Sequence, residues 1–277
     1  SLNGPFNRNF SLIGDPSLKL AIPDLKSDSH QFLDIGLDQT IDTLKAMQEV
    51  RLTGEIKDPL TGAMITDFQG DFELTIYDSP VTFNTLGDES SPIEFIEQSN
   101  ILYQGKGKVI NGIFSTDAFI PKQISSTIGE GTVRTYAISE GRILEAFGAK
   151  NILIGGQSTN DNNDTEGPLI NLKFGPELLE SAPIIASPVY PINIILEDES
   201  GIQVSSIPER RNITLQVNDQ TPITLNQMFF AIDGGFKKGK IETELQGLIE
   251  GINTITIQAW DNVGNNSIKT VQLEVKG

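Results

Sequence analysis

The 277-residue sequence contains no cysteine and a single histidine, His30. Without a thiol it offers no disulfide, no cysteine-ligated metal site and no cysteine nucleophile within these residues. One imidazole also excludes a metal site built from several histidines, and the polar neighbours of His30 predict an exposed surface residue. Because no nucleophile or nucleotide-binding motif is present either, we expect no catalytic residue and no cofactor.

Positive charge is also scarce. The chain has 20 Lys and Arg against 37 Asp and Glu, a net charge of 20 − 37 = −17. Such an excess repels phosphate backbones and anionic lipid, so the charge disfavours binding to nucleic acid or to a membrane face. Long apolar runs are missing too, since Pro188 and Pro191 break the best one, 184–196. We therefore expect no membrane insertion, and partners that are neutral or cationic.

What the sequence has in abundance is alternation of apolar and polar residues with a period of two. This period places every second side chain on one face of a β-strand. Clusters rich in Gly, Asn and Asp separate the alternating runs and suit the turns of hairpins. The pattern predicts an all-β fold. The clearest alternating residues are Phe72, Leu74 and Ile76; Ile213, Leu215 and Val217; Ile255, Ile257 and Ala259; and Val271, Leu273 and Val275.

Helical patterning is nearly absent, and its best candidate is a short helix over 42–50, capped by Asp42. The segment 105–107, Gly-Lys-Gly, superficially resembles a phosphate-binding loop, but its spacing fits neither known form and a hairpin is the better interpretation. The 26 Gly and 14 Pro are spread over many turns, which favours short ordered strands over disorder. Among all-β folds, we expect sandwiches rather than a barrel.

The length suggests about two domains, and a polar, acidic segment supplies a boundary between them. We expect two immunoglobulin-like β-sandwich domains in tandem, the first over 25–159 and the second over 169–277. Residues 160–168 form the acidic linker. Residues 1–24 belong to neither sandwich.

The linker carboxylates raise the question of a calcium site, because hard cations prefer closely spaced oxygen ligands. The spacing does not match an EF-hand loop, since Glu166 stands where the loop started at Asp161 needs glycine. A looser site formed by Asp161, Asp164 and Glu166 remains open. A solvated hinge is the simpler interpretation of the same residues.

Several segments resemble one family in the right order along nearly the whole chain. That family is the gingipain-like cysteine peptidases, particularly the PorU-type sortases of the type IX secretion system. The segment Phe10–Leu20 resembles the end of their catalytic domain. Asp42–Ala46 with Gly54, and Phe119–Ile124 with Gly129 and Gly131, resemble their first post-catalytic sandwich, whereas Asp198–Ile202 and Ala259–Ser267 resemble their last immunoglobulin-like domain.

This resemblance implies that the chain is an excerpt of a longer protein, either a sortase or a related secreted peptidase, located outside the cell or on its outer surface. Residues 1–24 would be the tail of the upstream peptidase domain. The catalytic Cys and His of the family have no matching positions, because the chain has no Cys and His30 follows the closing motif. The resemblance thus implies a fragment that is not itself an enzyme.

Two functions of the fragment remain open. In the first, the sandwiches are a structural appendage that packs against the upstream peptidase domain and orients that domain or an attached sorting signal. Secretion-system or surface proteins would then be further partners. In the second, the sandwiches form an adhesion or binding module for a surface protein or a glycan. The lack of an aromatic platform for stacking on sugars favours the first.

Overall fold

The alternating runs of the sequence are β-strands in the computed structural model, which describes residues 22–88, 91–124, 127–159, 162–206 and 211–276. The expected all-β class is confirmed. The segment Phe10–Leu20, which carries part of the family resemblance, lies outside the described residues. Among the described residues, no helix has the length and apolar character needed to cross a membrane.

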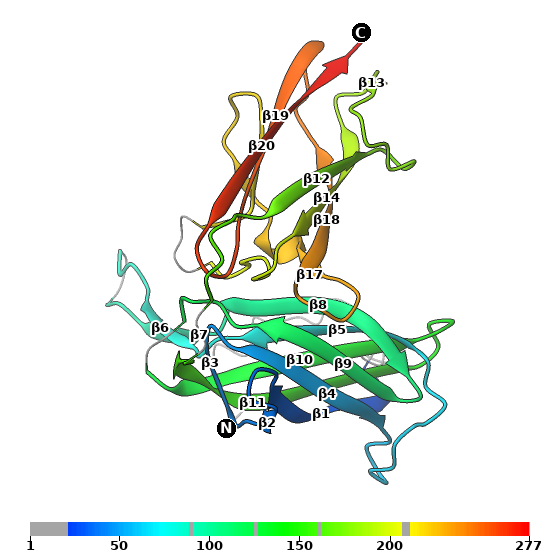
Figure 1. Cartoon of the computed structure of the whole chain (residues 1–277), viewed down its shortest axis with the longest axis vertical. Helices are drawn as coiled ribbons and strands as arrows, with labels where there is room; N and C mark the ends of the chain where they lie inside the picture. The colour runs from blue at the N-terminus through cyan, green and yellow to red at the C-terminus, as the bar shows by residue number, and fades with distance from the viewer. Residues whose placement is uncertain (1–21, 89–90, 125–126, 160–161, 207–210, 277) are drawn as a thin grey trace, which may run out of the picture.

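The N-terminal part of the chain forms a closed barrel of seven strands, seen in the lower part of Figure 1. Neighbouring strands are antiparallel, except that β1 and β11 run parallel. Two short strands, β2 (Gln39–Thr40) and β3 (Thr43–Ala46), pair with β1 and β11. The order around the barrel is β8 (Ile101–Ile110), β5 (Gly70–Tyr77), β10 (Gly129–Ser139), β11 (Glu145–Gln157), β1 (Leu25–Asp34), β4 (Glu49–Lys57) and β9 (Ile113–Phe119), which returns to β8.

The expected sandwich over 25–159 is therefore wrong in its architecture. A sandwich and a barrel both bury every second side chain, so alternation alone does not distinguish them. The difference lies in long-range pairing, above all between Leu25 of β1 and Ala146 of β11, which closes the sheet on itself. Such a pairing has no local signature in the sequence.

Aromatic rings from the two strands that flank β8 meet inside the barrel. Phe72 of β5 and Phe114 of β9 are both about 1% exposed, and their ring centroids lie 5.1 Å apart. Gly54 on β4 leaves room for the second ring, because a Cβ there would lie 2.2 Å from Cζ of Phe114. The barrel is thus filled by a packed core rather than by solvent.

The C-terminal half consists of two sheets, drawn above the barrel in Figure 1. Their apolar side chains alternate as expected, and Leu215, Ile255 and Ile257 are buried. The assignment of this half to the immunoglobulin-like class stays a prediction. One sheet contains β12 (Leu169–Phe174), β14 (Tyr190–Glu197), β18 (Lys238–Leu245) and β17 (Phe230–Ala231); the other contains β13 (Ile184–Ile185), β20 (Asn266–Val275), β19 (Gly251–Trp260), β15 (Thr214–Val217) and β16 (Ile223–Thr224), and a 3-10 turn spans Asn226–Met228.

The two halves share one continuous sheet. Strand β17 pairs in parallel with β8 of the barrel at Ala231 and Gly105, so the sheet runs from β12 across the junction into the barrel wall. Backbone and side-chain hydrogen bonds support this junction. For example, the Lys122 N–H donates to the Asn262 carbonyl, and the Ser205 hydroxyl donates to Oδ1 of Asn100.

One local expectation differs from the structure. The segment 42–50 holds β3 and the start of β4 instead of a helix. Leu44 and Ala46 are buried on alternate positions and β3 pairs with β11, so tertiary pairing overrides the weak helical preference. Met47 then turns the chain with a positive φ of 65°. The hairpin interpretation of residues 105–107 is confirmed, since they lie on β8, which forms a hairpin with β9 through the turn at Asn111 and Gly112.

One hairpin stands apart from both halves. Strands β6 (Val81–Asn84) and β7 (Glu94–Glu97) pair only with each other, and every residue in them is exposed. The hairpin projects sideways from the barrel in Figure 1. Its rings Phe83 and Phe95 stack with centroids 5.7 Å apart, and both remain more than 40% exposed. An isolated two-stranded hairpin is only marginally stable in water. Two aromatic rings that stay exposed on such a hairpin are therefore unusual for a surface that contacts only water.

Replacing a core ring should cost much more than replacing a hairpin ring. We expect Phe114→Ala to lower the free energy of unfolding by about 3–5 kcal/mol, because the cavity between β4, β5 and β9 cannot refill. The matched control Phe95→Ala removes a ring that is 45% exposed and should change the unfolding free energy little. Urea denaturation measures both. Equal losses in the two variants would contradict a packed barrel core.

Candidate functional site

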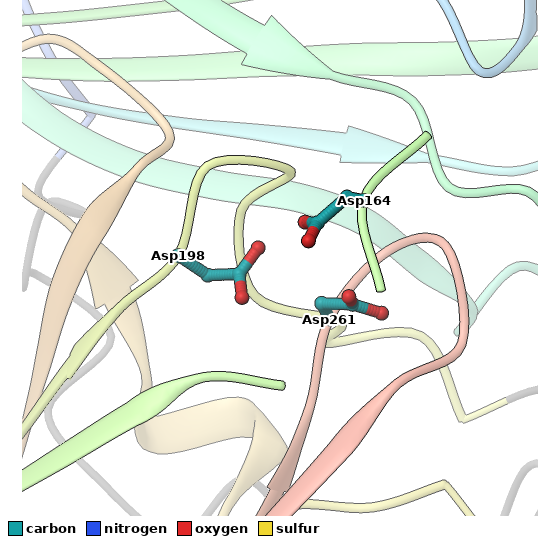
Figure 2. Close-up of side chains that lie close together, drawn as sticks. All are labelled: Asp164, Asp198 and Asp261. Atoms are coloured by element: carbon teal, nitrogen blue, oxygen red, sulfur yellow. The ribbon is translucent and has the colours of Figure 1, made fainter. Parts of the chain in front are cut away.

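Three aspartates that are far apart in the sequence converge on one point (Figure 2). Asp164 lies in the segment before β12, Asp198 directly follows β14, and Asp261 directly follows β19. One carboxylate oxygen from each lies within 4.8 Å of the others. Asp261 has no exposed surface, and the other two are partly buried.

Each aspartate also orders its own loop by accepting backbone hydrogen bonds. Oδ1 of Asp164 accepts from the Glu166 N–H at 3.0 Å, and Oδ1 of Asp198 accepts from the Ser200 N–H at 2.7 Å. Oδ1 of Asp261 accepts from the N–H groups of residues 263, 264 and 265. Aspartate favours such turns because its short carboxylate reaches the backbone two or three residues ahead. The three loops therefore have a structural reason for their aspartates.

Further hydrogen bonds connect the three loops. The Ser200 hydroxyl donates to Oδ2 of Asp164 at 2.6 Å and accepts from the Asn162 amide at 3.0 Å. The Asn265 amide donates both to the Asp164 carbonyl and to Oδ2 of Asp261. Residues 162–168 of the expected linker are thus held against the C-terminal half, which differs from a solvated hinge.

The electrostatics of the cluster are unfavourable for three full charges. Burial, with further contributions from the neighbouring charges of Asp261, Asp164 and Glu199, raises the pKa of Asp198 to about 7 against the lowering effect of the Ser200 N–H. Burial also raises the pKa of Asp261, although its hydrogen bonds to residues 263–265 oppose the shift. Like charges in a partly buried site disfavour simultaneous ionisation.

A proton or a cation can relieve this repulsion. The limit of 4.8 Å between the oxygens is about twice a calcium–oxygen distance of ~2.4 Å, so the three carboxylates can surround a hard divalent cation. Beside Asp164 and Asp198 lies an open hollow of about 490 Å³, whose other charged lining residues are Glu166, Glu197, Glu199, Lys237 and Lys238. Lys237 is paired with Glu199 rather than with the three aspartates.

The structure places only one of the three residues suggested by the sequence in the cluster. Of these three residues, Asp164 is in the cluster, Glu166 is exposed and lines the adjoining hollow, and Asp161 lies outside the described residues. Sequence reasoning missed Asp198 and Asp261 as partners. Each lies in a recognisable turn motif, Asp198-Glu-Ser-Gly or Asp261-Asn-Val-Gly. A turn motif does not indicate which loops meet in space.

Most of the chain shares its fold with part of a known structure, that of dimeric latent PorU from Porphyromonas gingivalis. The likeness covers 95% of this chain with a TM-score of 0.54 and 23% sequence identity. This chain spans about a quarter of that protein, since the match covers 25% of it. At this identity the comparison establishes a shared fold.

Two further solved structures match much more weakly. Red sea bream transglutaminase matches with a TM-score of 0.26 at 11% identity, over 93% of this chain and 32% of its own. The sporulation control protein Spo0M from Bacillus subtilis matches with a TM-score of 0.30 at 12% identity, over 91% of both chains. No protein-family model and no curated protein matches the sequence.

The raised pKa of Asp198 predicts a pH-dependent stability. Since the folded state binds this proton more tightly than the unfolded state, the contribution of Asp198 is fully favourable below the unfolded pKa, near ~4, and is lost as pH rises through about 7. Asp198→Asn removes the titrating carboxyl group and should therefore remove this pH-dependent contribution to stability. We therefore expect the melting temperature of the wild type, relative to that of the variant, to fall between about pH 4 and about pH 8.

The exposed Asp219 supplies the control for this measurement. Asp219→Asn should follow the wild-type pH profile of the melting temperature throughout. If the melting temperature of Asp198→Asn also followed the wild-type pH profile, the raised pKa of Asp198 would be contradicted.

Proposed function

We propose that this chain is the non-catalytic C-terminal β-region of a larger, PorU-type member of the gingipain-like cysteine peptidases. In this role it packs against a peptidase domain that precedes it and orients that domain or an attached sorting signal. The C-terminal half would be the immunoglobulin-like domain of such a protein. The parent would act outside the cell or on its outer surface.

The observation that carries this proposal is the fold shared with PorU over 95% of the chain. Because the match covers only 25% of PorU, the rest of such a protein has room for a separate catalytic domain. The similar segments along the sequence, such as Asp198–Ile202 and Ala259–Ser267, support the same assignment.

The composition supports a non-catalytic role for this part. A cysteine peptidase needs a thiolate nucleophile and a nearby base. These 277 residues have no cysteine, and the single histidine, His30, lies in β1 of the barrel. A peptidase of this class would therefore take its catalytic groups from elsewhere in the parent protein.

The hairpin formed by β6 and β7 is the surface best suited to contact another domain. Its exposed apolar side chains include Phe83, Phe95 and Ile96, the last 71% exposed, and nothing else among the described strands pairs with it. Exposed aromatic side chains are typical of protein interfaces. We propose that this hairpin contacts the peptidase domain of the parent protein.

The purified 277-residue chain should lack peptidase activity. We expect no cleavage of a mixed library of fluorogenic peptides, with a gingipain-type enzyme as the positive control. Inhibition of any trace activity by a thiol-reactive reagent would point to a contaminant, because this chain has no thiol. Cleavage that remains with the purified chain after such treatment would overturn the proposal.

The hairpin contact can be tested by binding. In a calorimetric titration of the separately purified peptidase domain into this chain, Phe83→Asp combined with Phe95→Asp should weaken binding roughly tenfold or more. Leu60→Asp is the matched control, because Leu60 is 94% exposed but lies in a different loop, between β4 and β5. Equal affinity of both variants would exclude the hairpin as the contact, and a specific glycan or foreign protein ligand would favour an adhesion module instead.

A further inference from the structure

We infer that the C-terminal half completes the wall of the barrel: the turn Ile232–Gly235 closes a break between β8 and β9, so the barrel and the C-terminal half form one rigid, cooperative unit. This inference concerns the chain by itself. It stands whether or not the chain belongs to a peptidase.

The break is visible in the pairing of the two strands. β8 runs over residues 101–110 and β9 over residues 113–119, but they pair only at Val109 with Phe114 and at Ile110 with Ile113. Beyond these pairs the strands separate. An open barrel wall would leave backbone N–H and C=O groups on both strands without ladder partners, which is costly where they are buried.

Gly234 supplies the missing partner for both strands. Its N–H donates to the Lys106 carbonyl of β8 at 3.2 Å, and its carbonyl accepts from the Asp117 N–H of β9 at 2.9 Å. A single residue from the C-terminal half thus occupies a ladder position between two strands of the barrel. This is an interaction of the same kind as those that hold the rest of the wall together.

The position requires glycine for two reasons. Gly234 has a φ of +69°, a conformation that costs residues with a Cβ roughly 1–2 kcal/mol. A Cβ there would also approach the Ser115 carbonyl oxygen of β9 to 3.3 Å. On the barrel side, a Cβ on Gly107 would lie at an ordinary contact distance of 3.4 Å from Cα of Gly234, whereas it would clash with the Phe72 ring at 2.6 Å.

Tyr103 bridges the same break from inside. Its hydroxyl lies 2.8 Å from the Thr116 hydroxyl of β9 and donates to the Gly235 carbonyl at 2.8 Å. The side chain starts on β8 and is only 5% exposed. One phenol group therefore contacts β8, β9 and the turn at once.

Contacts on either side of the break extend the joint. The Gln104 amide of β8 donates to the carbonyls of Asn226 and Phe229 in the C-terminal half. Phe236, just after the turn, packs on Phe119 of β9 with ring centroids 5.8 Å apart. Polar and apolar contacts together leave no free pivot between the halves, so the direction in which the C-terminal half projects is fixed by the barrel.

Hydrogen–deuterium exchange of the full chain, read by mass spectrometry, tests the inference. We expect Gly234→Ala to raise the exchange rate of the β9 peptide that contains Asp117 roughly tenfold, because the strained turn withdraws its hydrogen bonds. Gly235→Ala is the matched control, since no atom lies within 4 Å of a Cβ at that position. It should leave the exchange of this peptide unchanged.

A second variant and a second readout keep the test decisive. Tyr103→Phe removes the bridging hydroxyl and should raise exchange in both β9 and the turn. Trp260, the only tryptophan, reports unfolding of the C-terminal half, and its fluorescence transition should coincide with loss of protection in the barrel. Two separate transitions, or wild-type protection of the β9 peptide in both variants, would overturn the inference.

Discussion

Strand β8 is the element on which the rest of the structure depends, because it belongs to both halves of the protein. One edge pairs with β5 along its length, whereas the other edge is divided among β9, the turn at Gly234 and β17. Glycines at positions 105 and 107 let the rings of Tyr103 and Phe72 approach its backbone. The requirement that every buried backbone group find a partner thus joins a barrel and a pair of sheets into a single sheet system.

The alternation of apolar residues was sufficient to predict the all-β class and the inward faces of individual strands. Phe72, Leu74 and Ile76 are buried as expected, because the pleat alone dictates which side chains share a face. The barrel could not be predicted, since its closure depends on β1 meeting β11 across most of the N-terminal half. The expected helix over 42–50 failed for a related reason: only the pairing of β3 with β11 makes that segment a strand.

The acidic cluster is likewise only partly predictable from the sequence. A sequence reader can recognise Asp164 in a polar segment and the turn motifs at Asp198 and Asp261, because each aspartate bonds to its own loop. Their meeting depends on how three loops pack around Ser200, which is fully buried. Asp34 and Asp78 are also buried, but in the cluster the neighbouring carboxylates of Asp261 and Asp164 help to raise the pKa of Asp198.

The parallel pairing of β1 with β11 has a consequence for how the protein reaches its native state. Leu25 can pair with Ala146 only after β11 has been made or delivered, so β1 has no ladder partner on that side until then. Non-local pairings of this kind slow folding, because a long loop must close before the contact gains anything. A chain emerging from a ribosome or a channel with its N-terminus first would present β1 as an open strand edge, a stage at which a chaperone or a neighbouring chain could bind it.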